Sequence, residues 1–200
     1  MRTSIIIVSF FIVGIVLGLT DIIPDELFNN NISFYVLCAL MFCVGISIGS
    51  DSKTLKSFKR ISPVYYLLPL FTIIGTLGGC VLISFMLPER TIAEIMAVGS
   101  GFGYYSLSSI FITEYKGAEL GTIALLSNII REVMALLFAP FFVKYFGKLA
   151  LISVGGATTM DTTLPVILKF SGKEFLVVSL FSGFILDLSV PFLVTFFCTI

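Results

Sequence analysis

The chain has 200 residues and no net charge at pH 7; apolar residues make up 58% of it and charged residues only 12%. A soluble domain carries about 25% charged residues on average, so this composition excludes an ordinary soluble domain and predicts a protein embedded in lipid. The absence of a basic stripe excludes a nucleic-acid partner. The sequence has no histidine, and its cysteines lie in apolar runs without metal-site spacing, so we expect no metal and no cofactor.

Five apolar runs approach the roughly 20 residues that a membrane-spanning helix needs. In chain order they comprise residues 4–19, 32–49, 61–87, 121–146 and 175–200. Prolines inside the third and fifth runs are compatible with spanning, because neighbouring helices satisfy the freed carbonyl groups. The first run resembles a signal peptide, but no cleavage motif follows it, so we interpret it as an uncleaved span. The sequence therefore predicts an all-α polytopic membrane protein with about five full spans.

Two further apolar segments, residues 92–113 and 149–170, have middles rich in glycine, serine and threonine. Clustered glycines cost a helix about 1 kcal/mol each relative to alanine. Irregular backbone at membrane depth is tolerated only where it is buried in protein or lines a cavity. We therefore predict two broken or re-entrant helices. The alternative is close packing of continuous helices through small residues, since Gly99 and Gly103 form a GxxxG pair.

The basic residues predict the orientation in the membrane. The loop after residue 50 holds four basic residues, whereas the loop 21–31 holds none, which places the former loop and the N-terminus in the cytoplasm. If both broken segments re-enter, most lysines lie inside and only Arg90 and Lys116 lie outside. If both segments instead cross fully, eight basic residues lie inside and three outside, and either arrangement places the C-terminus outside. In the re-entrant arrangement, two units, each a span followed by a re-entrant segment, have opposite orientations. Such an inverted repeat is typical of secondary transporters, whose substrate site lies where the broken helices meet.

Polar residues interrupt the run 121–146. Ionisable groups within a membrane helix cost about 2.5–3.5 kcal/mol on insertion scales and usually mark a substrate or ion pathway. Asn128 and Glu132 share one helix face, and Ser127 and Arg131 share the adjacent face. We therefore predict that these four side chains face the pathway. The alternative is that Arg131 forms a structural ion pair with another acid, such as Asp187.

Three carboxyl groups are expected at membrane depth: Glu132, Asp161 in the second broken segment, and Asp187 in the last run. Without histidine, they are the candidates for carrying protons. Burial favours the neutral form of a carboxyl group, and a bound cation favours its charged form. This competition predicts the exchange of protons against a cationic substrate.

The broken segments offer groups for the opposite end of a substrate. Free N–H groups and the dipole at the N-terminus of a half-helix favour anions, so we expect the breaks to bind a substrate carboxylate. The residues concerned are Gly101, Gly103 and Tyr104 in the first break and Gly156, Thr158 and Thr159 in the second. Tyr104 and Tyr105 offer rings for an ammonium group, although ordinary packing explains them equally well. The combination suits a zwitterion with an extra positive charge.

Three stretches carry a family resemblance: GFGYYSLS at residues 101–108, LLSNIIRE at 125–132 and GGATTMD at 155–161. Together they closely resemble the bacterial lysine exporter (LysO) family, over most of the chain from about residue 32 onward. The resemblance implies a transporter rather than an enzyme, located in the bacterial inner membrane, which exports L-lysine and its toxic analogue thialysine. It also implies a role for the intramembrane acids at Glu132 and Asp161. We expect one transporter domain over residues 1–200, with a first span and outer loop in 1–31 and a family-like core in 32–200.

The usual family chain has further spans ahead of the matched part. The resemblance therefore implies either a separate small membrane protein that supplies the missing N-terminal spans or a homo-oligomer. The other expected partners are lysine or a similar cationic amino acid, protons and the lipid bilayer.

Three other functions compete with this reading. An intramembrane aspartyl protease needs paired aspartates with a GxGD element, which Asp161 lacks. A holin-like structural subunit would produce a leak without saturation. Export of another small metabolite by the same fold is the nearest rival.

Overall fold

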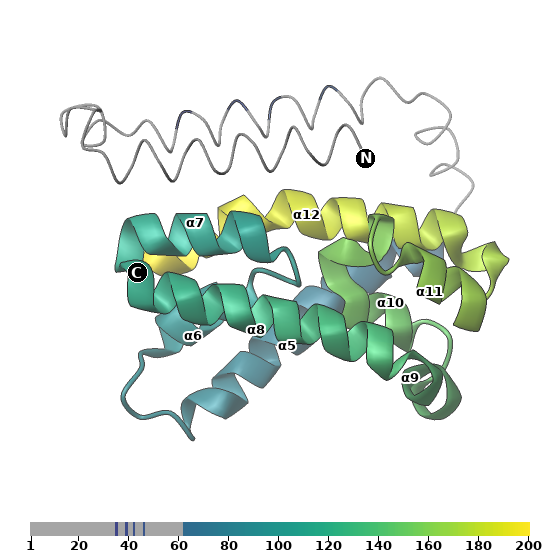
Figure 1. Ribbon diagram of the computed structural model, residues 1–200, viewed down its shortest axis with the longest axis horizontal. Coiled ribbons are helices and arrows are strands. Elements are labelled where there is room, and N and C mark those ends of the chain that lie inside the picture. Colours follow the sequence, from purple (N-terminus) through teal and green to yellow (C-terminus); the bar gives the residue numbers. More distant parts are fainter. Residues whose placement is uncertain (1–34, 36–38, 40–41, 43–45, 47–61) are drawn as a thin grey trace, which may run out of the picture. The chain divides into compact units, whose positions relative to one another are not determined.

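A computed structural model describes residues 35, 39, 42, 46 and 62–200. The chain divides into two compact units, Met1–Lys53 and Thr54–Ile200. The expected spans at 4–19 and 32–49 and the basic loop after residue 50 lie outside the described residues, apart from four helical positions of the second span. Residues 62–200 form helices without a strand (Figure 1). The all-α prediction is confirmed for this part of the chain.

Three stretches of the described unit are long and apolar enough to cross a membrane: Pro63–Ser84, Ala118–Leu137 and Lys173–Thr199. The first combines the short 3-10 helix η1 (Pro63–Leu67) with α5 (Leu68–Ser84), and the second is α8 (Ala118–Leu137). The third combines η3 (Lys173–Phe175) with α12 (Leu176–Thr199), which contains Pro191. The protein is therefore a membrane protein, as its composition predicted.

The run 121–146, expected as one span, is divided in the structure. Helix α8 ends at Leu137, and α9 (Ala139–Phe146) follows as a separate helix with Pro140 in its first turn. Proline lacks the N–H that would continue the ladder of α8, and its ring disfavours helical geometry at the residue before it. The 20 residues of α8 still suffice for one span.

Both predicted breaks are present. The first segment consists of α6 (Ile92–Gly99) and α7 (Tyr105–Lys116), and α6 begins with a capping box between Thr91 and Glu94. The second consists of α10 (Ala150–Gly155), the 3-10 helix η2 (Gly156–Met160) and α11 (Leu164–Phe170). Positive φ angles mark both breaks, at Phe102 and Gly103 in the first and at Gly156 in the second. The glycine-rich middles therefore interrupt the helices rather than pack continuous ones.

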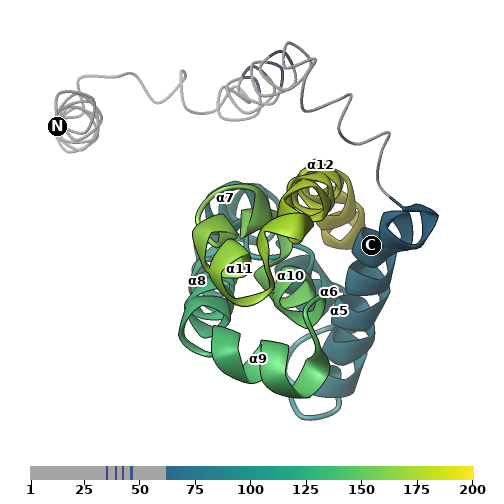
Figure 2. The ribbon, with the colours of Figure 1, turned by 90° about the vertical axis from the view of Figure 1, so that its right-hand side faces the viewer.

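The two broken segments lie toward opposite ends of the described unit. Helices α6 and α7 lie near the end where α8 begins, whereas α9, α10 and α11 lie near the end where α8 finishes (Figure 1). Figure 2, turned by 90°, places α9, α10 and α11 together in front. The breaks themselves meet, because the backbone N–H of Ala157 donates to the carbonyl oxygen of Phe102 at 2.9 Å. The fold thus brings both irregular stretches to one junction.

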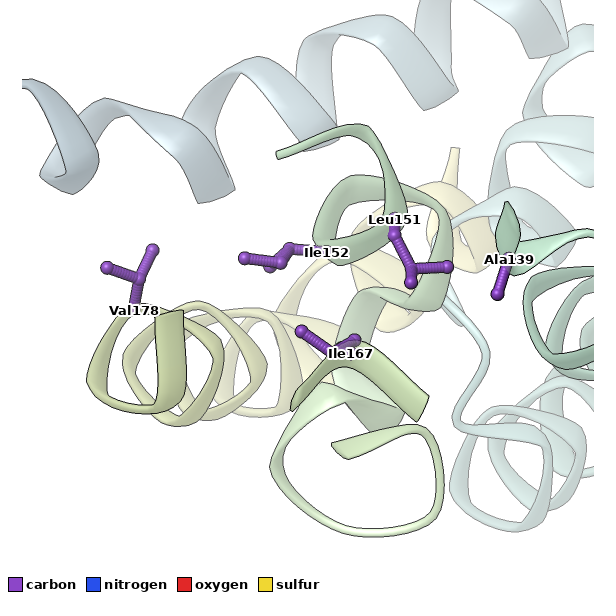
Figure 3. Packing of buried hydrophobic residues seen from close by; sticks show 5 residues of the cluster. All are labelled: Ala139, Leu151, Ile152, Ile167 and Val178. Carbon is purple, nitrogen blue, oxygen red and sulfur yellow. The ribbon is translucent and has the colours of Figure 1, made fainter. Parts of the chain in front are cut away.

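A cluster of buried apolar side chains supports the second segment (Figure 3). It joins α9, α10, α11 and α12 through Ala139, Leu151, Ile152, Ile167 and Val178. Lipid is as apolar as these side chains, so close van der Waals packing rather than exclusion from water stabilises such a contact. This packing holds α10 and α11 on either side of the second break.

Candidate functional site

The junction of the two breaks depends on glycine. Gly156 has φ +65°, and a Cβ atom there would lie 2.1 Å from the carbonyl oxygen of Phe102. Gly103 has φ +93°, and its Cβ would lie 3.2 Å from the carbonyl oxygen of Gly155. A larger residue at Gly156 would therefore force the two backbones apart, whereas one at Gly103 would crowd the Gly155 carbonyl group and be strained by its positive φ. This explains physically why glycines stand at the centres of both segments.

Asn128, near the middle of α8, fixes the first break. Its side-chain oxygen accepts a hydrogen bond from the N–H of Gly103 at 2.8 Å. Its amide nitrogen donates to the carbonyl oxygens of Ala124 and Val98 at 2.9 and 3.2 Å. The side chain is buried and its amide is fully engaged within the protein, so Asn128 positions the break.

Arg131, one turn further along α8, binds the second segment. Its Nε donates to the carbonyl oxygen of Val154 and its Nη2 to that of Ser153, both at 3.0 Å. Its guanidinium carbon lies 5.9 Å from the ring centre of Phe102 in the first break. These carbonyl groups belong to the last turn of α10, where the helix dipole favours a cation. Arg131 therefore connects α8 to both breaks.

The ion-pair alternative for Arg131 is not what the structure shows. Within the described unit the ion pairs are Arg90 with Glu119 and Lys148 with Glu174. The guanidinium is compensated by main-chain carbonyl groups instead. The side chain next to it in sequence, Glu132, contacts a different group.

Glu132 and Asp161 lie on either side of Thr162. The hydroxyl of Thr162 forms a hydrogen bond to Oε1 of Glu132. The N–H of Thr162 donates to Oδ1 of Asp161 at 2.5 Å, and its hydroxyl lies 3.4 Å from the same oxygen. Both predicted carboxylates are thus brought to one place, with a hydroxyl group between them. Asp161 and Thr162 are exposed in the described unit, and Glu132 is half-buried.

Asp187 approaches the same place from α12. It is 1% exposed, and its Oδ1 has no hydrogen-bond partner among the residues described. It borders a cavity of about 50 Å³, which we call the Asp187 cavity. The lining residues are Tyr104, Ala157, Thr158, Met160, Asp161 and Asp187. Asp161 therefore belongs both to the Thr162 contact and to this cavity.

Helix α12 can approach the second break because of Gly183, one turn before Asp187. A Cβ at Gly183 would lie 2.7 Å from Oγ1 of Thr159 and 2.8 Å from the backbone nitrogen of Met160. Thr159 donates from its hydroxyl to the carbonyl oxygens of Ser179 and Gly156. The hydroxyl of Thr158 similarly donates to Gly155. These two threonines therefore fix the backbone of the break.

The remaining predicted site residues either lie away from the junction of the two breaks or are engaged in contacts within the protein. Ser127 is exposed and lines a separate cavity of about 640 Å³, which also borders Gly99 and Cys80. Gly101 packs against Asn128 and Ser108. The backbone N–H groups of residues 101–105 all donate to acceptors inside the protein. The N–H groups that remain at this break are those of Ser106 and Leu107 in the first turn of α7, which has no side-chain cap.

Two residues of the site, Thr162 and Phe102, were not predicted from the sequence. Thr162 adjoins Asp161 in the stretch TTMDTT, but its contact with Glu132 spans 30 residues and leaves no periodic pattern. Phe102 is the residue with positive φ that is not glycine in the described part of the chain, and its carbonyl oxygen and ring both contact the second half of the site. Of the described residues, none form a group of three or more histidine, cysteine or acidic side chains that could hold a metal ion.

Comparison with known proteins gives consistent results. The family model described as "Lysine exporter LysO" matches residues 8–198. A Haemophilus influenzae protein named "Putative lysine exporter" is 34% identical over 192 residues, which cover 96% of each chain. An Escherichia coli protein named "Lysine exporter LysO" is 32% identical over 186 residues, which cover 93% of this chain and 61% of that protein. No solved structure matches the chain.

Proposed function

Because the chain belongs to the lysine exporter LysO family, we propose that it is a secondary transporter that exports L-lysine, and its analogue thialysine, across the bacterial inner membrane in exchange for protons. The observation that carries this proposal is the meeting of Glu132 and Asp161 beside the junction of two broken helices. Transporters commonly bind their substrate where broken helices meet. Carboxylates at that point suit a substrate with an extra positive charge.

Glu132 is the group that we assign to a lysine ammonium. It is half-buried, and its partner in the described unit is the uncharged hydroxyl of Thr162 rather than a basic side chain. An ammonium group has three N–H donors and no acceptor, so it can bind Glu132 directly and use the hydroxyl oxygen of Thr162 as a further acceptor. The N–H groups of Ser106 and Leu107, in the uncapped first turn of α7, are the candidates for the substrate carboxylate.

Proton exchange is part of the same proposal. Burial favours the neutral form of a carboxyl group, and a nearby ammonium group favours its ionised form. Binding of lysine close to a buried carboxyl group therefore favours release of a proton, and release of lysine permits one to return. The described unit holds no histidine that would carry protons instead.

We further propose that the two broken segments re-enter the membrane from opposite sides, as an inverted repeat. The lysines support an orientation with the α9–α11 end in the cytoplasm and the C-terminus outside. Lys144, Lys148, Lys169 and Lys173 belong to that end, whereas the α6–α7 end has Arg90 and Lys116. Cytoplasmic loops carry an excess of lysine and arginine. Rings of α9 close to one another, such as those of Phe141 and Tyr145, suit an interfacial position.

The test of the function is export by the Glu132→Gln variant in a lysine-sensitive bacterial strain. The variant keeps the shape and a hydrogen-bond acceptor for Thr162 but cannot ionise. We expect wild-type protein to lower intracellular lysine and to confer thialysine resistance, and Glu132→Gln to do neither while reaching the membrane in normal amounts. Glu132→Asp should keep partial activity, because its carboxylate is retained but retracted by one methylene.

Glu119→Gln is the matched control, since it lies on the same helix in an exposed pair with Arg90. Exposed pairs contribute little to stability, so this variant should export normally. A second control replaces Arg131 in the Glu132→Gln background. Since Arg131 is compensated by carbonyl groups, this change should not restore export. Restored export in the double variant would show that Glu132 serves only to neutralise Arg131.

The assembly of this chain with a second membrane chain is part of the same proposal. The chain spans about three fifths of the length of the Escherichia coli relative and nearly all of the Haemophilus influenzae relative. We propose that it assembles either with a copy of itself or with a small membrane protein that supplies further spans. Cross-linking in native membranes followed by mass determination distinguishes these two assemblies.

A further inference from the structure

The Asp187 cavity contains a buried group that the binding of lysine at Glu132 does not use. Oδ1 of Asp187 lacks a hydrogen-bond partner in the described unit, although the residue is 1% exposed. An unmade hydrogen bond of a buried polar atom costs about 1–3 kcal/mol, and more for a charged group. Buried charges are normally paired or coordinate a cation. Because Asp187 lines the cavity, the missing partner belongs inside it.

The size of the cavity restricts what that partner can be. Its volume is about 50 Å³, and a water molecule takes about 30 Å³ of the liquid. The cavity therefore has room for a few particles of the size of water. A small dehydrated cation or a protonated water molecule fits it.

The chemistry of the lining favours a cation. Asp161 and Asp187 both border the cavity, and two carboxylates beside one small space repel each other unless a cation or a proton lies between them. Oxygen atoms are the ligands that small hard cations prefer. Unwound backbone in broken helices coordinates sodium ions or protons in other transporters, and Ala157, Thr158 and Met160 of the 3-10 helix η2 line this cavity.

We propose that the Asp187 cavity binds the small monovalent cation, a proton or a sodium ion, that is exchanged for lysine. This site is distinct from the ammonium site at Glu132, and the proposal rests on the proposed export function. The titratable groups that face Asp187 across the cavity are Asp161 from the second break and Tyr104 from the start of α7.

Asp161 provides the connection between the two sites. It borders the cavity on one side, and on the other it accepts a hydrogen bond from Thr162, whose hydroxyl contacts Glu132. A cation between Asp161 and Asp187 and an ammonium group near Glu132 therefore compete for the same negative charge. This competition makes the binding of one unfavourable for the other, which is the requirement for exchange.

The test compares wild-type protein and Asp187→Asn in liposomes with radiolabelled lysine. Lysine–lysine exchange at equal pH and sodium on both sides measures lysine binding without a need for the coupling cation. Net lysine movement under an imposed pH gradient or sodium gradient measures coupling. We expect either the pH gradient or the sodium gradient to accelerate net lysine movement by the wild type at least about fivefold, which is the lower end of the range of coupling factors between two binding sites. Asp187→Asn should keep lysine–lysine exchange and lose the acceleration by either gradient.

Ser182→Ala is the matched control. Ser182 lies on the same helix, is buried and also has an unpartnered oxygen in the described unit, but it does not line the cavity. It should respond to the gradient as the wild type does. Acceleration by a pH gradient assigns the site to protons, and acceleration by a sodium gradient assigns it to sodium.

Several results would overturn the proposal. One is that a gradient accelerates lysine transport by Asp187→Asn as much as by the wild type. Another is that Asp187→Asn is folded but no longer exchanges lysine for lysine. A third is that neither gradient accelerates lysine transport by the wild type. A wild-type protein without any lysine exchange would instead refute the export function itself. If Asp187→Asn fails to reach the membrane, labelling of wild-type Asp187 with a carbodiimide replaces it. The coupling cation should reduce that labelling, and labelling unaffected by both cations would reject the site.

Discussion

Replacement of Gly156 by alanine tests whether direct contact between the two breaks is needed for transport. The residue has φ +65° and ψ −128°, a conformation essentially restricted to glycine, whose cost for other residues is about 1–3 kcal/mol. The new Cβ would also lie 2.1 Å from the carbonyl oxygen of Phe102. The breaks must then separate, and the hydrogen bond from Ala157 to Phe102 is lost. An unsatisfied buried pair adds about 1–3 kcal/mol.

Gly147→Ala separates these two contributions. Gly147 has φ +89° and ψ 170°, so it carries the same kind of backbone cost, but no atom lies within 4 Å of its added Cβ. The difference in unfolding free energy between the two variants therefore reports the junction alone. At about 2–4 °C per kcal/mol for a chain of this size, Gly156→Ala should melt roughly 2–12 °C below Gly147→Ala.

The assay is thermal unfolding of the purified proteins in detergent, together with lysine export in cells. We expect Gly147→Ala to export lysine and Gly156→Ala to fail. Equal melting temperatures with equal export would refute the reasoning, because they would show that the contact between the breaks contributes neither stability nor transport.

Three further predictions concern the junction and the orientation. Asn128→Ala should abolish export and leave the N–H of Gly103 without its acceptor, at a cost of about 1–3 kcal/mol in thermal unfolding; full export would show that the first break needs no anchor on α8. Arg131→Lys keeps the charge but loses the planar fork that reaches two carbonyl groups, so it should lose about 1.5–3 kcal/mol; unchanged stability would mean that charge alone suffices. In a cysteine-free background, Glu89→Cys should react with an impermeant reagent only from outside and Lys173→Cys only from the cytoplasm; outside labelling at Lys173 would reject the orientation.

The breaks and their partners differ in how far the sequence predicts them. Clustered glycines between apolar flanks predicted both interruptions, because the helical cost of glycine is local. The spacing of Asn128 and Glu132 predicted a shared face of the helix, and their side chains contact Gly103 and Thr162, respectively; that they face a pathway stays a prediction. Pro140 is a local signal for the division of the run 121–146, whereas apolar content alone predicts one continuous span.

The contacts across the junction were not predictable in the same way. Arg131 was expected to face a pathway or pair with an acid, and it binds the carbonyl groups of Ser153 and Val154 instead. Main-chain carbonyl groups are present at every residue, so the sequence contains no mark of which ones a guanidinium will reach. The role of Thr162 depends likewise on the approach of two distant helices. The substrate assignments of the carboxylates remain predictions.

The separate connections of the two breaks to α8 determine which movements are energetically inexpensive. Asn128 ties the first break to α8 and Arg131 ties the second, whereas the backbone hydrogen bond between the breaks is that from Ala157 to Phe102. Loss of this single bond costs about 1–3 kcal/mol while its two groups stay buried. Detachment of the first segment from α8 would also break the hydrogen bonds of Asn128. Detachment of the second would break the charge-assisted hydrogen bonds of Arg131. Thermal fluctuations should therefore part the breaks from each other far more often than they detach either one from α8.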